Sequence, residues 1–457
     1  MSVSDNAHAF YYRISIIFFI AENGRMESLM KSYKEMSKEE LASLADELER
    51  EYKDVKERGL KLDMSRGKPS KEQLDISMPV LDAVTSGSDL TSESGVDCRN
   101  YGCPDGIDEA RRLMADIMEV DPDNVIVCGN ASLPLMYDSI SRSYTHGVCG
   151  EKPWYMLDKV KWLCPVPGYD RHFAITEHFG IEMITVPMLQ TGPDMDVVES
   201  YVNLDPAVKG IWCVPKYSNP QGISYSDDTV RRIAALTPAA ADFRVYWDNA
   251  YAIHHLYDDD RDDILEIFSE CEKRGNTDMV LEFASTSKVS FAGAGIAGVA
   301  ASKANLKWIK SSMAIQIIGH DKINMLRHAR YFKDINGLDA HMRKHAEILR
   351  PKYEAVLKTF DDALDGLGIA KWTKPKGGYF ISFDAMEGCA KEIVDKCKEA
   401  GVTLTAAGAT YPYGRDPEDS NIRIAPSLPS PEDMAKASEL FVLCVKLVSA
   451  RKILSER

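Results

Sequence analysis

The sequence lacks a net positive charge, paired cysteines and a long apolar run, and each absence excludes a class of protein. Its 457 residues carry 55 Lys and Arg against 70 Asp and Glu, a formal net charge of −15. No net basic field is available to hold a polyanion, so nucleic acid is not expected as a partner. None of the ten cysteines forms a CxxC pair. We therefore expect reduced thiols in a cytoplasmic protein, without a disulfide framework or a metal site.

The start of the chain holds the one segment that could be mistaken for a membrane or secretory signal. Residues 10–20 are largely apolar but too short to span a bilayer, and the AENGR sequence that follows lacks a small-residue cleavage site. A charged, amphipathic pattern begins only at Met26. We interpret residues 1–25 as an over-extended start, disordered or loosely packed, and expect no membrane partner.

Short apolar runs alternate with polar, helix-compatible stretches between residues 124 and 302. Continuous apolar runs are typical of strands that are buried on both faces, and their alternation with helices indicates an α/β fold with a mostly parallel sheet. The runs cover residues 125–128, 162–165, 183–186, 210–214, 245–247, 280–283 and 296–301. The sequence therefore predicts a seven-stranded sheet in a large domain spanning residues 76–334.

The two ends of the chain have a different pattern. Residues 26–61 have helical periodicity, with Ser37 ahead of Glu39 and Glu40 as a helix start. A long helical stretch covers about residues 323–364, residues 378–383 alternate like a strand, and a last helix begins near Pro431. We expect residues 26–75 and 335–457 to form one smaller α+β domain beside the large one.

Four local signatures carry the chemical information. They are SNPQG at residues 218–222, YWDNAY at 246–251, STSK at 285–288 and NIRI at 421–424. In order and spacing they resemble the fold-type I aminotransferases, which use pyridoxal 5'-phosphate, and the resemblance extends from about residue 61 to the end. Residues 64–69, 129–133 and 321–324 further resemble a bacterial subgroup of aspartate aminotransferases.

Lys288 is the expected catalytic residue. It follows the apolar run at 280–284, so its amine should lie at the carboxyl end of a strand, where open α/β sheets bind ligands. A lysine amine there can bind the cofactor aldehyde as a Schiff base and move a proton during catalysis. Without the other signatures, Lys288 would be interpreted as a solvated loop lysine.

Asp248 is the expected partner of the cofactor's ring nitrogen. It ends an apolar strand, where an unpaired carboxylate would be costly, and a pyridinium cation would stabilise it. The alternative is a helix N-cap. By resemblance, Asn219 and Tyr251 bind the cofactor's O3′. The alternatives are a type I turn at Asn219, favoured by Pro and Gly in SNPQG, and a packing role for Tyr251.

The cofactor phosphate needs hydrogen-bond donors, and two segments can supply them. Ser285 and Ser287 flank the lysine, while residues 129–132 precede a helical stretch whose N-terminus favours anions. The resemblance implies backbone donors at Asn130 and Ala131 and a hydroxyl donor at Ser132. The alternative for each is a helix cap or a surface polar residue.

Three further residues are assigned by the resemblance alone. Tyr101 matches a tyrosine that reaches the phosphate from a second subunit, which implies a homodimer with shared sites. Tyr169 matches the aromatic residue that stacks on the cofactor ring, and His172 follows three residues later, as in aspartate aminotransferases. A core aromatic residue and a buried, hydrogen-bonded histidine are the respective alternatives.

Arg423 is the expected ligand of the substrate α-carboxylate, because a buried arginine requires an anion and its planar fork fits a carboxylate. The alternative is an internal salt bridge. A dicarboxylic substrate needs a second cation. By resemblance, Lys322 lies about as far past Lys288 as the arginine that binds the distal carboxylate in the best-known aspartate aminotransferases, although it is a lysine here. It competes with Arg66 and Lys68, which flank Gly67 in a loop that resembles a substrate-covering segment.

Several rival functions have to be weighed. Residues 293–298 match the GxGxxG pattern of nicotinamide-dependent dehydrogenases, but the glycines lie far beyond the apolar run and an apparent strand follows them. A ligand sensor would need a DNA-binding module, for which there is no room. A β-eliminating lyase or an aminotransferase for another amino acid would share all four signatures. We expect ping-pong transamination between aspartate and 2-oxoglutarate.

Overall fold

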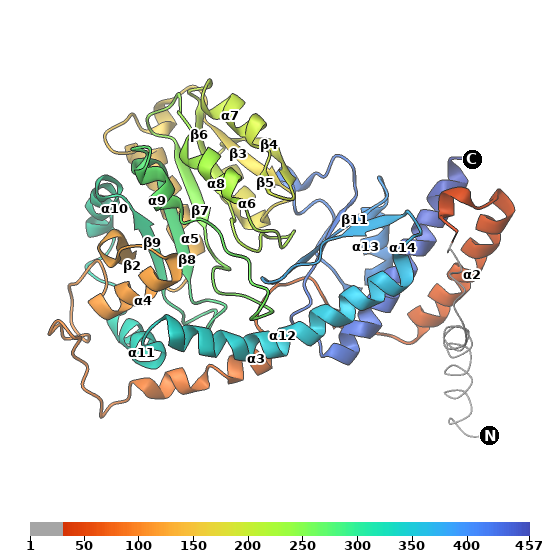
Figure 1. The fold of residues 1–457 in the computed structure, drawn as a ribbon, viewed down its shortest axis with the longest axis horizontal. Helices are drawn as coiled ribbons and strands as arrows, with labels where there is room; N and C mark the ends of the chain where they lie inside the picture. The colour runs from red at the N-terminus through yellow and green to blue at the C-terminus, as the bar shows by residue number, and fades with distance from the viewer. Residues whose placement is uncertain (1–30) are drawn as a thin grey trace.

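The computed structural model describes residues 31–457, so the expected over-extended start at residues 1–25 lies outside the described residues. Figure 1 shows a large sheet with its helices at one end of the molecule. At the other end lie α2 (Lys38–Glu57), α13 (Ala390–Glu399) and α14 (Pro431–Ser455). The long helix α12 (Ile335–Leu364) runs from one end to the other.

The large sheet contains all seven predicted strands. Its order is β2-β9-β8-β7-β6-β3-β4-β5, with parallel pairing from β8 through β7, β6 and β3 to β4. The other three pairs are antiparallel. The strands are β2 (Val125–Val127), β3 (Lys161–Val166), β4 (Glu182–Leu189), β5 (Gly192–Pro193), β6 (Val208–Cys213), β7 (Arg244–Asp248), β8 (Val280–Ser285) and β9 (Ala297–Ala301). The predicted mostly parallel α/β sheet is confirmed, and the two-residue β5 is an eighth strand that no apolar run indicated.

Helices cover both faces of this sheet. Leu281 and Phe283 of β8 pack in the cluster that holds α5 (Ser132–His146), while Ala284 packs in the cluster that holds α4 (Asp108–Met118). Burial on both faces explains the continuous apolar runs. The remaining helices of this end are α6 (Asp170–His178), α7 (Met195–Val202), α8 (Asp227–Ala234), α9 (Ile267–Glu272), α10 (Lys303–Gln316) and α11 (Lys322–Phe332).

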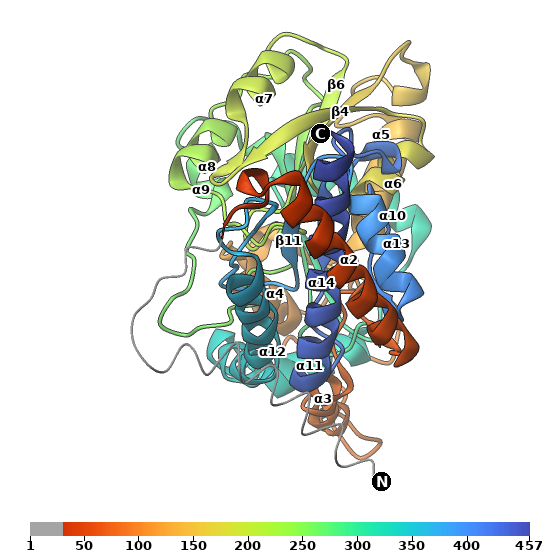
Figure 2. The same cartoon turned by 90° about the vertical axis from the view of Figure 1, so that its right-hand side faces the viewer.

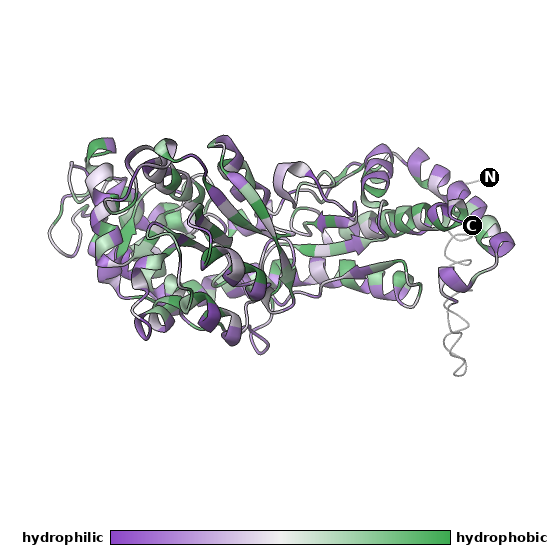
Figure 3. Cartoon of the chain, turned by 90° about the horizontal axis from the view of Figure 1, so that it is seen from above, coloured by the Kyte–Doolittle hydropathy of each residue, from purple (hydrophilic) through white to green (hydrophobic). Residues whose placement is uncertain are grey.

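The other end has its own hydrophobic core, built from both termini of the described chain. It joins Tyr33 and Leu48 near the start to Phe441 on α14. A three-stranded antiparallel sheet lies on it, formed by β10 (Ala370–Trp372), β11 (Ile381–Ala385) and β13 (Asn421–Ile424), and β1 (Leu62–Asp63) pairs with β12 (Val402–Thr403). Figure 2 shows α2, α12 and α14 together at this end, and Figure 3 shows polar residues mostly on outer helices and loops.

Two helix predictions need comment. The Ser37 start is confirmed, because its hydroxyl accepts the Glu40 N–H and Glu40 caps back in return. The helical stretch expected over 323–364 is confirmed, but it is divided into two helices, because Lys333 has a φ of 68° and Asp334 caps a new helix there. The second helix, α12, contributes Leu338 to a core of the large-sheet end and Phe360 to the core of the other end. The domain division at residue 335 stays a prediction.

Among residues 31–457, none of the helices has the length and apolar character needed to cross a bilayer.

Candidate active site

Lys288 lies in the turn that follows the central strand β8. Its Nζ is 4.9 Å from the ring centroid of Tyr251 and 5.9 Å from that of Tyr379. Burial lowers the pKa of the Lys288 amine below its ordinary value, and the charge of Asp248 acts in the opposite direction. The lysine predicted from the STSK signature is therefore a half-buried residue whose amine lies beside aromatic rings, not a fully solvated loop residue.

Asp248 lies at the end of β7, next to β8 in the sheet. Its side chain is buried, and its Oδ2 accepts a hydrogen bond from His172 Nε2 at 2.9 Å. The other oxygen, Oδ1, is buried and has no hydrogen-bond partner among residues 31–457. No helix begins between residues 249 and 266, so the alternative reading of Asp248 as a helix N-cap is wrong.

The ring of His172 is held in place by two contacts besides Asp248. It stacks on Trp212 with centroids 4.3 Å apart and planes inclined by 10°, and it meets the Tyr169 ring edge-on at 4.9 Å. Tyr169 precedes α6, and burial raises the pKa of its hydroxyl to about 12. Both predicted residues therefore lie on the Asp248 side of the site.

The environment of Tyr251 is influenced by several of these site residues. Tyr251 is buried, which raises its pKa well above the ordinary value; the charge of Asp248 raises that pKa further and that of Arg423 lowers it. The Tyr251 ring thus lies beside the Lys288 amine, and the charges of Asp248 and Arg423 act on its hydroxyl.

Asn219 is buried, and its Oδ1 accepts a hydrogen bond from Arg423 Nη1 at 3.2 Å. The turn around it is closed by Gly222 N–H donating to Ser218 O at 2.6 Å. That bond spans one residue more than the bond of a β-turn. The type I turn interpretation of SNPQG is therefore wrong, while the placement of Asn219 beside Arg423 joins two of the four signatures.

The predicted phosphate segments meet one another. Ser287 Oγ donates to the Asn130 carbonyl at 3.2 Å, and Ser285 Oγ donates to Ser287 Oγ at 3.0 Å. Helix α5 begins at Ser132, and its N-cap residue Ala131 provides no side-chain cap. The first N–H groups of a helix lack intrahelical acceptors. Backbone donors and hydroxyls therefore gather beside the Lys288 turn.

Arg423 lies on β13, and its side chain is 8% exposed. Its Nη1 also donates to Asp170 Oδ1 at 2.8 Å, and its Nη2 donates to Thr405 Oγ1 at 3.4 Å. The guanidinium carbon lies 4.9 Å from the centroid of the Phe380 ring. Arg423 thus forms the internal salt bridge that was the alternative interpretation, with Asp170 as its partner. The same guanidinium lies beside Asn219.

The loop at residues 66–68 passes close to Arg423. A Cβ at Gly67 would collide with the Phe380 ring that faces the guanidinium, so glycine allows this close approach. Ser427 Oγ donates to the Lys68 carbonyl at 2.8 Å and to the Arg66 carbonyl at 3.3 Å. The backbone is thereby fastened, and the Arg66 and Lys68 side chains are exposed.

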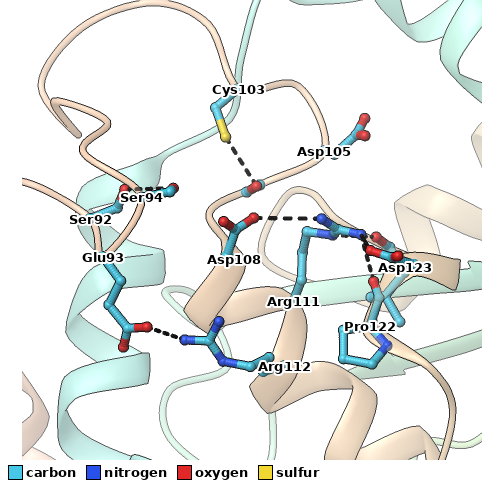
Figure 4. A network of polar contacts seen from close by, with 12 residues as sticks. Ser92, Glu93, Ser94, Cys103, Asp105, Asp108, Arg111, Arg112, Pro122 and Asp123 are labelled. Atoms are coloured by element: carbon cyan, nitrogen blue, oxygen red, sulfur yellow. Dashed lines mark hydrogen bonds and ion pairs between the residues drawn. The ribbon is translucent and has the colours of Figure 1, made fainter.

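Tyr101 and Lys322 are brought together, away from the contacts described so far. The Lys322 side chain is buried and its Nζ donates to the Gly102 carbonyl at 3.0 Å, whereas Tyr101 is 80% exposed. Figure 4 shows how the chain on either side is fastened: Cys103 Sγ donates to the Gly106 carbonyl, and Arg111 and Arg112 of α4 bind Asp123 and Glu93. A well-held loop therefore presents Tyr101 to the outside.

Two residues near the site were missed by the sequence reasoning. Asp170 binds Arg423, although its only local signal is an acid at a helix start. Arg327 of α11 lines a cavity of about 280 Å³ together with Asn130 and Gly295, and its Nε has no hydrogen-bond partner in the described chain. No local pattern distinguishes Arg327 from the neighbouring basic residues.

The glycine-rich segment at 293–298 does not form a dinucleotide-binding turn. Gly298 lies inside β9, so no helix opens there. A Cβ at Gly295 would come within 2.9 Å of Thr286 Oγ1 and 3.2 Å of the Asn130 carbonyl. The glycines therefore allow close packing beside the Lys288 turn.

Comparisons with known proteins agree with this geometry. The family model for aspartate amino-transferase matches residues 36–457. An aspartate aminotransferase of Corynebacterium glutamicum is 45% identical over 420 residues, 92% of this chain and 96% of that protein. The solved structure of an aspartate transaminase from the same species has a TM-score of 0.89 at 45% identity and covers 92% of this chain and 99% of that one. The fold also resembles an α-aminoadipate aminotransferase from Thermus thermophilus, at a TM-score of 0.69 and 18% identity, over 85% of this chain and 92% of that one. The chain belongs to the aspartate aminotransferase family and has its fold-type I architecture.

Proposed function

We propose that this chain is a pyridoxal-phosphate-dependent aspartate aminotransferase that exchanges amino groups between aspartate and 2-oxoglutarate in a ping-pong cycle. One observation carries the proposal: the Lys288 amine lies 4.9 Å from the centroid of the Tyr251 ring, and the neighbouring strand β7 ends in buried Asp248, whose Oδ1 has no partner in the described chain. A nucleophilic amine close to a buried carboxylate suits amino acid chemistry on such a cofactor.

The groups present fit the cofactor at both of its ends. Asp248 Oδ1 is a buried carboxylate oxygen without a partner in the described chain, and a pyridinium N–H would supply one. The uncapped start of α5 and the hydroxyls of Ser132, Ser285 and Ser287 would bind the phosphate. Tyr169, Asn219 and Tyr251 would hold the ring between these ends.

When bound, the cofactor supplies an electron sink for the negative charge that develops at the substrate α-carbon. Asp248 would hold the proton on the ring nitrogen. Lys288 would bind the cofactor covalently between cycles, and its amine would take the α-proton and return it on the cofactor side. The lowered pKa of Lys288 suits this work, because a neutral amine is needed to accept a proton.

Arg423 would bind the substrate α-carboxylate. Aspartate as the donor is supported by the 45% identity to the Corynebacterium glutamicum enzyme over most of both chains. Its distal carboxylate requires a second cation, for which Lys322, Arg66 and Lys68 compete. The fixed backbone of the loop at 66–68 supports Arg66 and Lys68 as ligands of the distal carboxylate. The contact of Lys322 with the Tyr101 loop supports a role of Lys322 in the site of a neighbouring subunit.

The proposal includes a homodimer with shared sites, in the cytoplasm. Tyr101 supports the dimer, because a large aromatic side chain that is 80% exposed on a fastened loop is suited to contact a second subunit. The ten cysteines are free thiols, which supports a reducing compartment. Division into a small domain (26–75 and 335–457) and a large domain (76–334) is part of the same proposal.

A donor screen tests the proposed function. The purified, cofactor-loaded protein would be incubated with 2-oxoglutarate and each of aspartate, alanine, phenylalanine and α-aminoadipate, and glutamate formation measured. Aspartate should be preferred. Preference for another donor would contradict the aspartate assignment alone, while no glutamate with any donor, together with release of pyruvate and ammonia from free serine or cysteine, which carry a leaving group on the β-carbon, would favour an eliminating enzyme.

A further inference from the structure

The guanidinium that is expected to receive the substrate carboxylate is already bonded to a carboxylate of this chain. Asp170 Oδ1 accepts from Arg423 Nη1 at 2.8 Å, and the two side chains are 33% and 8% exposed. Asp170 is the first residue of α6, at the end of the molecule that holds the large sheet. Arg423 lies on β13, in the three-stranded sheet of the other end. Charge-assisted bonds of partly buried groups are among the stronger polar contacts in proteins.

The hydrogens of Arg423 determine where a second carboxylate can bind. Nη1 carries two N–H groups, and both are used, one by Asp170 and one by Asn219. Nε is buried without a partner in the described chain, so the edge formed by Nε is closed to solvent. Nη2 has only the 3.4 Å contact with Thr405. A carboxylate that binds through both Nη1 and Nη2 needs a hydrogen that the chain already occupies.

We propose that Asp170 is an internal competitor for the α-carboxylate position, bound to Arg423 in the absence of substrate and displaced when substrate binds. The inference rests on the proposed role of Arg423. Asp170 is the group to leave, because its negative charge would repel the incoming carboxylate, whereas the neutral Asn219 amide would not. Its partial exposure gives it access to water, and the start of α6 still favours its charge after it has moved.

This arrangement lowers the affinity for every amino acid and oxo acid by a similar factor, because all of them carry the same carboxylate. It also returns the guanidinium to a neutralised state as each product leaves. A reversible enzyme that exchanges two substrates at one site benefits from such release, since tight binding of a product would slow the next half-reaction. Asp170 thereby sets affinity without touching the reacting atoms.

Asp170→Asn keeps the size of the side chain and removes its charge. A neutral acceptor holds an arginine less firmly than a carboxylate, and the difference corresponds to about five- to tenfold in a dissociation constant. Succinate serves as the probe, because it has two carboxylates and no amino group and cannot react. Its binding to the cofactor-loaded and cofactor-free proteins would be measured by calorimetry, with the KM for aspartate measured alongside.

A matched control is available at Asp227, the first residue of α8, which is paired with Arg231 at 3.1 Å. Asp227→Asn makes the same change of charge at the same helix position. Succinate should bind about five- to tenfold more tightly to Asp170→Asn, with a parallel fall in KM, and unchanged to Asp227→Asn. If Asp170→Asn proves unstable in thermal unfolding, Asp170→Ser removes the same charge.

Unchanged or weaker succinate binding by Asp170→Asn would overturn the inference, because Asp170 would then only orient Arg423. Arg423→Met separates this failure from failure of the proposed function. Native-like succinate binding by Arg423→Met means that Arg423 is not the carboxylate ligand, and the proposed site fails with the inference. Loss of binding in Arg423→Met, without tighter binding in Asp170→Asn, removes only the role of Asp170.

Discussion

His172 Nε2 lies 2.9 Å from Asp248 Oδ2, and the imidazole ring is fixed against Trp212 by stacking at 4.3 Å. A carboxylate can only accept, so Nε2 carries the hydrogen of this bond. Oδ1 of the same carboxylate is left buried and unpartnered within residues 31–457. One oxygen therefore orients the aspartate, and the other is available to a cationic ring nitrogen.

Asp248→Asn should retain bound cofactor and lose most transamination. The neutral amide keeps the shape of the side chain but no longer holds a proton on the ring nitrogen, and loss of one charge-assisted contact corresponds to about ten- to hundredfold in kcat/KM. Single-turnover kinetics with aspartate would measure the loss, with cofactor content determined by absorbance. Full activity in a cofactor-replete Asp248→Asn protein would remove Asp248 from the site.

Lys288→Ala should abolish the visible absorbance of lysine-bound cofactor and lower transamination at least about a thousandfold, because both the covalent link and the proton-transfer group disappear. Lys307→Ala, an exposed lysine of α10, is the control and should behave as native. A Lys288→Ala protein with near-native turnover is incompatible with the proposed function as a whole.

Buried histidines should make the protein less stable in mild acid. Burial lowers the pKa of His328 to about 4 and that of His345 to about 3, from 6.5. The pKa of each histidine is lower in the folded state than in the unfolded state, so the unfolded state takes up protons first as the pH falls. Above about pH 6.5 both states are unprotonated, and neither histidine changes the free energy of unfolding with pH. Stability is therefore lost between about pH 6.5 and pH 4, by about 2 kcal/mol per histidine at pH 5.

The thermal midpoint of the cofactor-free protein, measured from pH 7.5 to pH 5, would reveal this loss. His328 bonds Ser290 Oγ at 2.8 Å and the Asn324 carbonyl at 2.8 Å. His328→Gln should lower the midpoint at pH 7.5 and flatten its decline with acid, whereas His146→Gln, at an exposed position, should leave the decline unchanged. An equally steep decline in His328→Gln would refute the assignment.

The fold was largely predictable because its main signals are local. Strands buried on both faces leave continuous apolar runs, and all seven runs became strands of the large sheet. The break between α11 and α12 left no such signal: the left-handed residue there is Lys333, where glycine or asparagine would have marked it. The two-residue β5 is likewise too short to leave a pattern.

The site residues likewise fall into those that a local sequence signal marks and those that have no such signal. Lys288, Asp248 and Asn219 each stand in a compact signature, so the sequence could single them out. The Asp170–Arg423 pair joins residues 253 positions apart, and such pairing depends on how the two cores meet. The buried position of Lys322 could not be foreseen either, because its acceptor is a backbone carbonyl, which every residue possesses.

Removal of Arg423 and removal of Lys322 should have different effects. Arg423→Ala should depress activity toward every donor, because all amino acids carry the α-carboxylate. Lys322→Ala should depress activity toward aspartate alone, by about ten- to hundredfold in kcat/KM for one lost charge-assisted contact. Alanine and phenylalanine, which lack a distal carboxylate, should react almost as well as before.

The contact of Lys322 with the Gly102 carbonyl requires a control, since loss of that bond can loosen the Tyr101 loop. A loosened loop would lower cofactor affinity and thus activity toward all donors, so cofactor content and the alanine rate must be measured with the aspartate rate. Equal losses for aspartate and alanine would assign Lys322 to holding the loop. Intact aspartate turnover in Lys322→Ala would leave Arg66 and Lys68, beside Gly67, as the distal ligands, and the double variant Arg66→Ala/Lys68→Ala should then show the aspartate-selective loss.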